Sequence, residues 1–523
     1  MPVDNMLASQ TLIDTLHRTA AKHPHKLAIR QGEQNWTYAE FYERCLNVAS
    51  GMQQLGIVPG DRVAILARNS SSFAVSRYAI AAVGAVLVPV NFMLNAQESA
   101  YILNHSGARL LLVGATESAK SEMLAALCPG IERMVWLGSE AGLPSPPGMI
   151  PFSDLAREME YTPVNTVSAA DAAQIIYTSG TESAPKGAVL SHAAILWQYG
   201  SCLVDAEVAE VDTHLHSMPL YHCAQLDCFL GPSIQVGGSN IITDDPSPEN
   251  LLTLIAAEGV TAFFAPPTVW IALLNSPLFA QTDLTSLRKG YYGASIMPVE
   301  IMRKLQQRLP KIRLWNLYGQ TEIAPLATIL KPEDQLRKPG SAGKAVLHVQ
   351  TRVVNDDGTD VAVGDIGEVV HRSPQLLSEY YNDPERTAQA FAGGWFHSGD
   401  LATIDEEGYL TIVDRKKDMI KTGGENVSGR EVEEALYQCA DVAEAAVIGL
   451  PHPQWIEAVT AIVVLQPTAL PDEEKIIRHC ASILAGFKVP KKILFVDNLP
   501  RNPSGKILKR DLREAHADTF RSV

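Results

Sequence analysis

The stretch Tyr177-Thr-Ser-Gly-Thr-Glu-Ser-Ala-Pro-Lys-Gly187 lies between two apolar runs, residues 172–176 and 188–190, and Gln174 interrupts the first of them. This pattern predicts a strand, an exposed loop, and then a second strand or the start of a helix. Hydroxyl groups and glycine N–H groups of the loop can donate hydrogen bonds to phosphate oxygens, and Lys186 adds a mobile cation. A P-loop needs Gly-Lys-Ser/Thr, whereas the order here is Lys186-Gly187. On its own, the stretch is either a phosphate-binding loop of another kind or a solvated Ser/Gly-rich loop.

The composition indicates a globular protein of two or three domains. The chain has 523 residues, of which 46% are hydrophobic and 19% are charged. Its net charge of −15 argues against a general nucleic-acid binder. Residues 485–515 nevertheless hold eight Lys and Arg against three Asp and Glu, so this end is either a solvated face or a surface for a polyanionic ligand.

The cysteines and the apolar runs predict a soluble, cytoplasmic protein without a transmembrane segment. The seven cysteines are odd in number and lack the spacing of metal ligands, which favours reduced thiols. The longest apolar run, residues 78–90, is too short to cross a bilayer. The N-terminus lacks the pattern of a signal peptide.

Strands and helices alternate in the first part of the chain, which predicts a largely parallel sheet covered by helices. We expect helices at residues 12–21, 37–54 and 70–85, strands at residues 26–30 and 110–113, and a turn that leads into a buried strand within residues 56–66. Residues 138–170 contain five prolines and predict a surface connection.

Three further strands are predicted at residues 260–265, 287–292 and 312–317, and turns follow them. Two of these turns, Gly293-Ala-Ser295 and Tyr318-Gly-Gln-Thr-Glu322, are rich in glycine and hydroxyl groups. Because ligands of open α/β sheets bind outside the carboxyl ends of the strands, the turns suggest one shared nucleotide site.

Three histidines, His214, His216 and His222, lie near a predicted turn. No carboxylate stands in ligand spacing to them, so a metal site is not favoured. His222 is either the gate of a pocket or a buried imidazole. Asp227 either touches that pocket or caps a helix.

Eight motifs in order resemble the adenylate-forming superfamily, which includes acyl-CoA synthetases, luciferases and the adenylation domains of peptide synthetases. The motifs are Tyr177 to Gly187, Pro219-Leu-Tyr-His222, Gly293-Ala-Ser295, Tyr318-Gly-Gln-Thr-Glu322, Trp395-Phe-His-Ser-Gly-Asp400, Asp414-Arg-Lys-Lys-Asp418, Gly423-Gly-Glu425 and Pro503-Ser-Gly-Lys506. The loop departs from the family in carrying Glu182-Ser183 where Thr-Gly is usual, and we expect Glu182 to point away from the phosphates.

The resemblance implies an α/β fold with a large N-terminal domain of helix-covered sheets and a small, mobile α+β C-terminal domain. The expected domains are residues 1–416, which bind AMP and the acyl group, and residues 417–523, which carry the catalytic lysine. The hinge is expected at Lys417.

The resemblance also implies a ligase that uses ATP, Mg²⁺ and coenzyme A. A carboxylic acid first forms acyl-AMP and pyrophosphate, and the thiol of CoA then forms a thioester and releases AMP. Three residues are implied to be catalytic: Lys506 bridges the carboxylate and the α-phosphate, Thr321 contacts a phosphate oxygen, and Glu322 is the magnesium ligand.

The nucleotide is expected to contact residues of several motifs. The phosphate side comprises Thr178, Ser179, Gly180, Thr181 and Lys186. The adenine side comprises Gly293, Ala294, Ser295, Asn316, Tyr318 and Gly319. Asp400 and Arg415 are assigned to the ribose, with Lys506 and Thr321 completing the set.

The residues expected to line the acid pocket are mainly small or apolar, with His222 as a possible gate, which favours an apolar carboxylate as substrate. Its candidates are His222, Gln225, Leu226, Gly293, Gly319, Ile323, Ala324 and Pro325. The CoA tunnel is expected to contain Lys421, Gly423, Gly424 and Glu425.

We favour a medium- to long-chain fatty acid as substrate. An aryl or short branched acid is the close competitor, and a stand-alone enzyme that loads a carrier protein in trans is a further alternative. The expected partners are therefore the acid, ATP and CoA, with no nucleic acid; a homodimer is left open.

Overall fold

The two apolar runs on either side of the loop form paired strands, a β-hairpin, near one end of the first sheet. Strand β8 (Ala172–Thr178) pairs antiparallel with β9 (Lys186–Ser191), and Thr178 lies opposite Lys186. The structure is a computed structural model that describes residues 10–158, 160–164, 166–178, 185–293, 297–416, 418–423, 425–501 and 507–520. They divide into two compact units, Met1–Gln350 with Arg372–Phe396, and Thr351–His371 with His397–Val523.

The hairpin belongs to a sheet of eight strands among the described residues, in the order β19-β9-β8-β4-β3-β5-β6-β7. From β8 to β7 the neighbours run parallel, as the strand–helix alternation predicts, whereas β19 and β9 are antiparallel. The bounds of the other strands are β3 (Arg62–Leu66), β4 (Val86–Pro89), β5 (Ala108–Val113), β6 (Arg133–Trp136), β7 (Ile150–Pro151) and β19 (Glu379–Tyr380).

A second sheet of the first unit has nine strands within the described residues, in the order β16-β15-β14-β13-β12-β10-β11-β1-β2. Its central strands, β10 to β14, are parallel, so their carboxyl ends meet at one edge. The bounds are β1 (Leu27–Gln31), β2 (Gln34–Thr37), β10 (Thr213–His216), β11 (Ser239–Ile242), β12 (Ala262–Phe264), β13 (Lys289–Gly293), β14 (Arg313–Gly319), β15 (Leu326–Leu330) and β16 (Lys344–Ala345).

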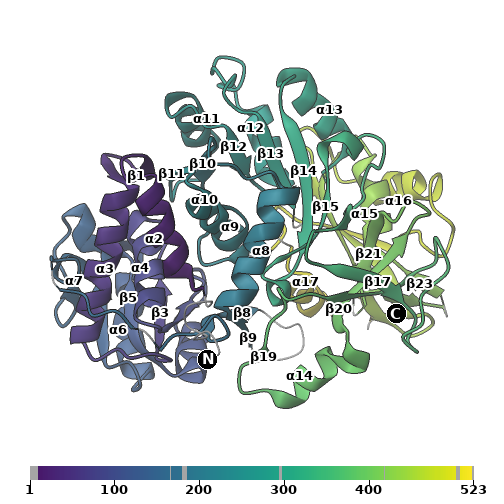
Figure 1. The fold of residues 1–523 in the computed structure, drawn as a ribbon. Coiled ribbons are helices and arrows are strands. Elements are labelled where there is room, and N and C mark those ends of the chain that lie inside the picture. The colour runs from purple at the N-terminus through teal and green to yellow at the C-terminus, as the bar shows by residue number, and fades with distance from the viewer. Residues whose placement is uncertain are drawn as a thin grey trace. The chain divides into compact units, whose positions relative to one another are not determined.

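The helices of the first unit begin where the sequence places their caps. Thr37 accepts a hydrogen bond from the Glu40 N–H, and Glu40 accepts from the Thr37 N–H, which is the reciprocal cap expected of a Thr-x-x-Glu start. In Figure 1, α2, α3 and α4 lie side by side. The helices are α2 (Leu12–Lys22), α3 (Tyr38–Gln54), α4 (Ser71–Ala82), α5 (Ala96–Ser106), α6 (Ser118–Leu127), α7 (Phe152–Leu155), α8 (His192–Asp205), α9 (Cys223–Gln225), α10 (Gly231–Val236), α11 (Pro248–Ala257), α12 (Pro267–Asn275), α13 (Val299–Arg308) and α14 (Pro384–Ala390).

The region 138–170 differs from the surface connection that its prolines predict. It contains β7 and the short helix α7, and the side chains of Phe152 and Leu155 are buried in the core. These two apolar side chains anchor the segment, because burying them removes apolar surface from water.

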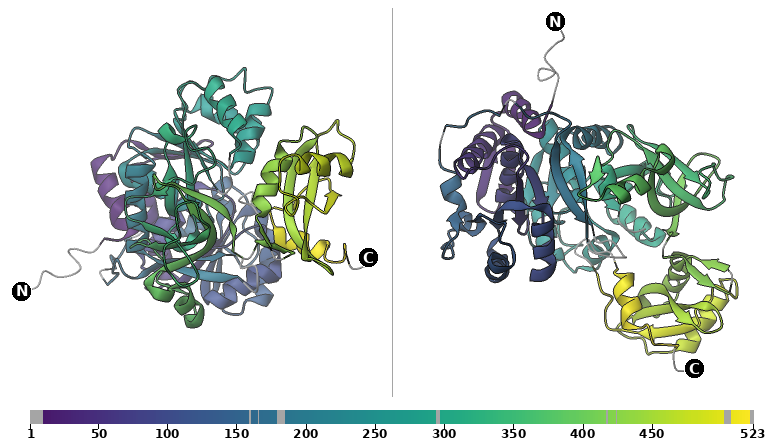
Figure 2. Two further views of the ribbon diagram at one scale, coloured as in Figure 1. Left: turned by 90° about the vertical axis from the view of Figure 1, so that its right-hand side faces the viewer. Right: turned by 90° about the horizontal axis from the view of Figure 1, so that it is seen from below.

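The described part of the second unit contains two sheets. A four-stranded sheet has the order β17-β18-β20-β21, and a five-stranded sheet has the order β23-β22-β25-β24 with β26 beside β25. Figure 2 shows the five-stranded sheet with its helices in light green to yellow. The bounds are β17 (Gln350–Val354), β18 (Gly367–Arg372), β20 (Phe396–Ile404), β21 (Leu410–Arg415), β22 (Ile420–Thr422), β23 (Glu425–Val427), α15 (Gly429–Tyr437), β24 (Val442–His452), β25 (Ile456–Leu465), α16 (Glu473–Ala481), β26 (Lys492–Phe495) and α17 (Lys509–Ala515).

The described residues include no helix with the length and apolar character that a membrane span needs.

Candidate functional site

Lys186 and Glu322 form an ion pair at the end of the hairpin. The Lys186 Nζ lies 2.9 Å from the Glu322 Oε1. The hydroxyl of Tyr380 joins both groups, because it accepts from Lys186 at 2.7 Å and donates to the same Glu322 oxygen at 2.9 Å. The Lys186 ammonium also lies 4.3 Å from the centre of the Tyr380 ring. Residues from three distant parts of the sequence thus meet at one point.

Glu322 remains a carboxylate in this environment. Burial by itself raises the pKa of the Glu322 carboxyl, but the charge and hydrogen bonds of Lys186 and the hydroxyl of Tyr380 lower that pKa below its ordinary value overall. The main chain is fixed as well, since the Leu377 N–H donates to the Glu322 carbonyl at 2.7 Å. Glu322 is therefore a buried, held anion at neutral pH.

Sequence reasoning found Lys186 and Glu322 but missed Tyr380. Its place comes from β19, which pairs antiparallel with β9 so that Tyr380 lies opposite Ala188. The sequence around it, Ser378-Glu-Tyr-Tyr381, has no glycine or spacing signal that would have marked it. Only the pairing of two strands far apart in the chain brings it to the site.

The turn that carries Thr321 and Glu322 depends on Gly319. A Cβ at this position would lie 1.8 Å from the Pro325 carbonyl oxygen, and that carbonyl accepts a hydrogen bond from the Gln320 N–H. Because no side chain fits there, the turn can fold back on itself only with glycine. The Thr321 hydroxyl lies 3.4 Å from the Cys223 Sγ.

The adjoining strand end carries the residues assigned to adenine. Strands β13 and β14 are parallel neighbours, with Gly293 opposite Leu317. A Cβ at Gly293 would lie 2.6 Å from the Leu317 carbonyl oxygen, so this close approach also requires glycine. The Asn316 amide donates to the Ser341 carbonyl at 2.8 Å, and Tyr318 is half-buried. Gly293, Asn316 and Tyr318 thus lie on neighbouring strands at one edge.

The residues assigned to the acid pocket divide into apolar and hydrogen-bonded members. Leu226, Ile323 and Ala324 are fully buried. Burial lowers the pKa of His222 to about 4, so this imidazole is neutral at pH 7, and its Nδ1 accepts from the Ala224 N–H at 3.1 Å.

The carboxamide of Gln225 is engaged on both sides. Its oxygen accepts from the Met218 N–H at 3.3 Å, and its nitrogen lies 2.7 Å from the Nδ1 of His216. The Nε2 of His216 lies 2.9 Å from the Asn240 Oδ1. These contacts hold Gln225 in place as a structural member of the pocket region.

Asp227 is neither exposed nor a helix cap. It is fully buried in a π-helical turn, Leu226–Leu230, and its Oδ1 lies 2.5 Å from the Nη2 of Arg77.

The part of the chain that the structure describes contains no group of three or more His, Cys, Asp and Glu that could hold a metal ion. Glu322 with substrate phosphates does fit Mg²⁺, because this ion is commonly held by one or two carboxylates together with phosphates and water.

In the second unit, Asp400 and Arg415 face each other across β20 and β21. The Arg415 Nε lies 2.8 Å from the Asp400 Oδ1, and Asp400 is buried. The next carboxylate, Asp414, accepts from the Gly429 N–H at 2.9 Å and so caps the start of α15.

Three of the residues assigned to CoA, Lys421, Gly423 and Glu425, lie on or next to the paired strands β22 and β23. Lys421 and Glu425 are exposed, and Gly423 lies at the turn with a φ of 60°. The Gly423 N–H donates to the Trp455 carbonyl at 2.9 Å, and the Lys421 N–H donates to Glu457 at 2.7 Å.

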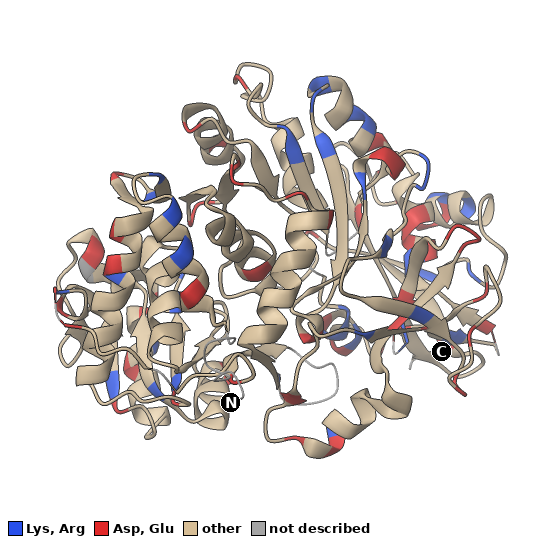
Figure 3. Ribbon diagram, viewed as in Figure 1, with Lys and Arg blue, Asp and Glu red and all other residues tan. Residues whose placement is uncertain are grey.

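The basic excess of residues 485–515 is largely paired with carboxylates, which favours a solvated, salt-bridged face over a free polyanion surface. Figure 3 shows basic and acidic residues interspersed over this unit. The pairs are Lys488–Glu431, Lys492–Glu473, Arg501–Glu444, Lys509–Glu433, Arg510–Glu514 and Arg513–Asp418. Lys491 instead donates to the Gly486 carbonyl and lies 5.2 Å from the Trp455 ring centre.

Several predicted site residues lie outside the described residues. They are Ser179, Gly180, Thr181, the Glu182-Ser183 variation, Ala294, Ser295, Lys417, Gly424 and Lys506.

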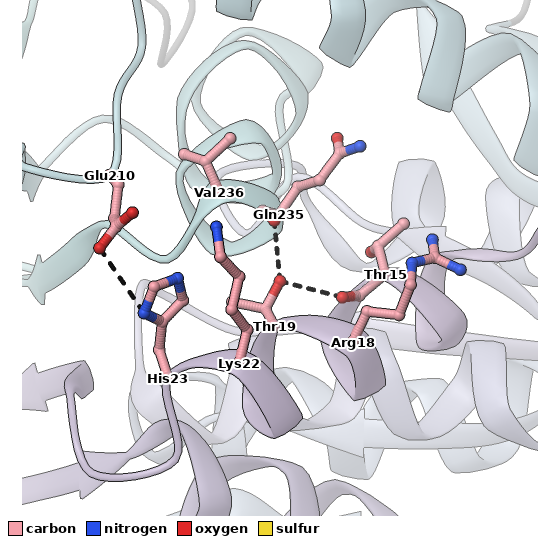
Figure 4. A pocket seen from close by; sticks show the side chains of 8 residues that line it. All are labelled: Thr15, Arg18, Thr19, Lys22, His23, Glu210, Gln235 and Val236. Atoms are coloured by element: carbon pink, nitrogen blue, oxygen red, sulfur yellow. Dashed lines mark hydrogen bonds and ion pairs between the residues drawn. The ribbon is translucent and has the colours of Figure 1, made fainter.

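A cavity of about 430 Å³ lies between α2 and α10 and has a different character (Figure 4). It is lined by Thr15, Arg18, Thr19, Lys22, His23, Glu210, Gln235 and Val236. Its mixed charges do not suit an apolar acid, and none of these residues belongs to a motif of the site.

Comparison with known proteins covers nearly the whole chain. The family model described as AMP-binding enzyme matches residues 16–381, and the model of the AMP-binding enzyme C-terminal domain matches residues 431–506. A feruloyl-CoA synthase from Amycolatopsis sp is 36% identical over 95% of this chain and 97% of its own length. The long-chain-fatty-acid–CoA ligase FadD13 from Mycobacterium tuberculosis is 36% identical over 92% of this chain and 93% of its own. The crystal structure of the anthranilate CoA ligase AuaEII with anthranoyl-AMP has a TM-score of 0.89 at 28% identity and covers 98% of both chains.

Proposed function

Because the chain belongs to the AMP-binding enzyme family and is an AMP-forming acid–thiol ligase, we propose that it joins an apolar carboxylic acid to coenzyme A. The observation that carries the proposal is the cluster of Lys186, Glu322 and Tyr380. It brings a carboxylate and an ammonium group together at the start of β9, and the hydroxyl of Tyr380 bonds to both. Such a cluster suits a triphosphate and its counter-ion.

In the first step a carboxylate oxygen of the acid attacks the α-phosphorus of ATP. The bond to the bridging oxygen of pyrophosphate breaks, so acyl-AMP and pyrophosphate are the products. Catalysis of this step rests on positioning and on stabilising negative charge. We assign Lys186 to the charge on the departing pyrophosphate, and Lys506 to the attacking carboxylate and the α-phosphate.

Mg²⁺ would be held by Glu322 and by phosphate oxygens, and when bound it would neutralise phosphate charge. The chain itself contributes an anion that stays deprotonated, because Lys186 and Tyr380 lower the pKa of Glu322. We also assign Thr321 to a phosphate oxygen, and Asp400 with Arg415 to the ribose.

In the second step the thiolate of CoA attacks the acyl carbonyl carbon of acyl-AMP, and AMP leaves as the thioester forms. We assign the hairpin of Lys421, Gly423 and Glu425 to the pantetheine arm, because a glycine turn permits close approach of the backbone. We take residues 417–523 to be the mobile domain, with its hinge at Lys417.

For the acid we propose a medium- to long-chain fatty acid, supported by the buried apolar side chains of Leu226 and Ile323 and by the neutral imidazole of His222. An aryl acid is the second candidate, because relatives named feruloyl-CoA synthase and indoleacetate–CoA ligase span this chain. We propose the cytoplasm as the compartment, on the grounds that the seven cysteines are all free and buried.

The direct test is pyrophosphate and AMP release over a panel of acids, with dodecanoate and cinnamate as representatives, in the presence and absence of CoA. We expect acid-dependent pyrophosphate release, and AMP with thioester only when CoA is added. Acyl-AMP without any CoA thioester would favour a carrier-protein acceptor. Absence of AMP and thioester with every acid would contradict the proposal.

Lys506→Ala separates the two steps. We expect the variant to lose adenylation by at least roughly 100-fold while it still converts supplied acyl-AMP and CoA to thioester. Arg510→Ala is the matched control, because Arg510 is an exposed cation of the same region that pairs with Glu514 on its own helix. Equal loss of both steps in Lys506→Ala would contradict the role assigned to this residue.

A further inference from the structure

Asp227, which directly follows the pocket candidates Gln225 and Leu226 in the chain, belongs to a buried polar group of four side chains. The Arg77 guanidinium donates to the Asp227 Oδ1 at 2.5 Å and to the Gln174 oxygen at 2.7 Å. Gln174 in turn donates to the Asp227 Oδ2 at 2.8 Å, and the Tyr199 hydroxyl lies 3.4 Å from Oδ1. All four residues are buried, so the contacts form a closed arrangement away from water.

The local backbone is shaped to admit this group. Asp227 lies in the π-helical turn between α9 and α10, and a wider turn of this kind is frequent at functional sites. Gly231 follows the turn, and a Cβ there would lie 1.9 Å from the Tyr199 hydroxyl oxygen. Glycine at this position therefore lets Tyr199 reach Asp227.

Stability alone is a poor reason for such a pair. Taking two charges out of water costs several kcal/mol per ion, and well-packed apolar residues of similar volume are often at least as stable. A buried pair can instead fix how two elements are placed relative to each other, because each buried charge accepts few alternative positions. Arg77 is suited to this task since its planar fork binds two partners in fixed directions.

The buried polar group connects two elements, β8 and the helical segment after Cys223, and each of them also contributes residues near the candidate site. Gln174 lies on β8, whose last residue, Thr178, is opposite Lys186. Asp227 lies just after Gln225 and Leu226 in the π-helical turn that follows α9. Helix α9 begins at Cys223, which contacts Thr321. The group thus ties the hairpin on the phosphate side to the helix on the acid side.

We propose that Asp227, held by Arg77, Gln174 and Tyr199, is a positioning residue that fixes the acid pocket relative to the phosphate-side hairpin. It contacts neither substrate, and acts through the placement of the helix that carries Gln225 and Leu226. This inference rests on the proposed acid–CoA ligase function and adds to it a determinant of acid specificity.

The test compares three variants over the same acid panel. Asp227→Asn keeps the shape but removes the charge, and the double variant Arg77→Met/Asp227→Leu removes both charges and restores apolar packing. We expect both to raise the KM for the acid, to alter the ranking of acids, and to lower kcat/KM in adenylation by roughly 100-fold, because misplacement of about an ångström has that effect. Tyr199→Phe, which removes the longest of the contacts, should have a smaller effect of the same kind.

Asp212→Asn is the matched control. Asp212 pairs with Lys289 at 2.7 Å and is also buried. It directly precedes β10, so it lies at the amino ends of the parallel strands β10 to β14, whereas the candidate site lies at their carboxyl ends. We expect this variant to lower the midpoint of thermal unfolding while leaving the ranking of acids and the KM for each acid unchanged.

The decisive comparison is between stability and specificity in the double variant. A double variant that recovers the thermal midpoint but keeps the altered ranking supports the positioning role. A double variant with the ranking and kcat/KM of the wild type overturns it, and so does an Asp227→Asn variant whose activity falls only with its folded fraction. A wild-type protein inactive with every acid would overturn the proposed function first, and the positioning role with it.

Discussion

Tyr380 joins the two charges of the site through one hydroxyl group. We expect Tyr380→Phe to lower the rate of acyl-AMP formation by about 10- to 100-fold, because a hydrogen bond to a charged group contributes roughly 1.5–3 kcal/mol. The direct contact of Lys186 with Glu322 and the position of the ammonium over the ring should persist. Pyrophosphate exchange measures the effect. Tyr381→Phe is the control, since the Tyr381 ring packs against His105 instead, and equal losses in the two variants would contradict the role of the hydroxyl.

Ile456 adopts a backbone conformation that its side chain disfavours. Its φ is 69°, which is strained for a β-branched residue, and its side chain is 69% exposed. We expect Ile456→Gly to raise the free energy of unfolding by about 1 kcal/mol, because the relief of strain exceeds the entropy cost of glycine. Urea unfolding measures the change.

The control for Ile456→Gly is Leu470→Gly. Leu470 is also an exposed apolar residue, at 82%, but it does not have a positive φ. This control should be neutral or destabilising. A loss of stability in Ile456→Gly equal to that of the control would show that the backbone at residue 456 stores no strain.

At the scale of elements, the turn between β14 and β15 positions Thr321 and Glu322, the side chains to which we assign catalytic roles. We expect Gly319→Ala to destabilise the protein by roughly 1–3 kcal/mol and to impair adenylation, because the new methyl group collides with the Pro325 carbonyl and displaces Thr321 and Glu322. Thermal unfolding and pyrophosphate exchange measure the two effects. Gly130→Ala is the control, since the nearest atom to its Cβ would be 3.9 Å away; a wild-type exchange rate in Gly319→Ala would contradict the argument.

Local sequence signals allowed many of the helices and strands to be predicted. The cap at Thr37 and the apolar periodicity after it place α3 within a residue, and the apolar run before the loop gives β8. The run after the loop left a strand and a helix start open, and it forms β9. Tyr380 and the partner of Asp227 were not predictable in this way. Each depends on contacts between segments more than fifty residues apart, and no periodicity reports such contacts.

At the scale of the whole molecule, the compact units and the expected domains divide the chain differently. The four-stranded sheet of residues 350–415 groups with the C-terminal part. Hydrogen bonds from Ser428 and Gly429 to Val413 and Asp414 explain the grouping, because they fasten α15 to β21. The domain boundary at residue 416 and the hinge at Lys417 stay predictions.

Buried histidines should make the protein sensitive to acid. Burial lowers the pKa of His192 to about 4 and those of His214 and His216 to about 3, from an ordinary value of 6.5. Below pH 6.5 the unfolded chain therefore binds more protons than the folded one, so stability falls as the pH falls. Each histidine contributes about 1.4 kcal/mol per pH unit down to its folded pKa. We expect the urea midpoint to drop steeply between pH 6.5 and 4.

A substitution at one histidine checks the origin of this slope. His192→Asn should reduce the slope of unfolding free energy against pH by the contribution of one proton, because the variant lacks the imidazole that takes up a proton on unfolding. The amide oxygen of Asn can still accept the hydrogen bond from the Leu12 N–H that now goes to the imidazole, so the fold should persist. His25→Asn, at an exposed histidine, should leave the slope unchanged. An unaltered slope in His192→Asn would mean that other groups cause the acid sensitivity.

All seven cysteine side chains are buried, and burial raises the pKa of the Cys223 thiol next to Thr321. The folded protein thus exposes no thiol that could intercept an activated acyl group, whereas the thiol of CoA is accessible in solution. A colorimetric disulfide reagent will accordingly read free CoA without a background from the protein. The same reagent, added without CoA, will report the moment the chain unfolds.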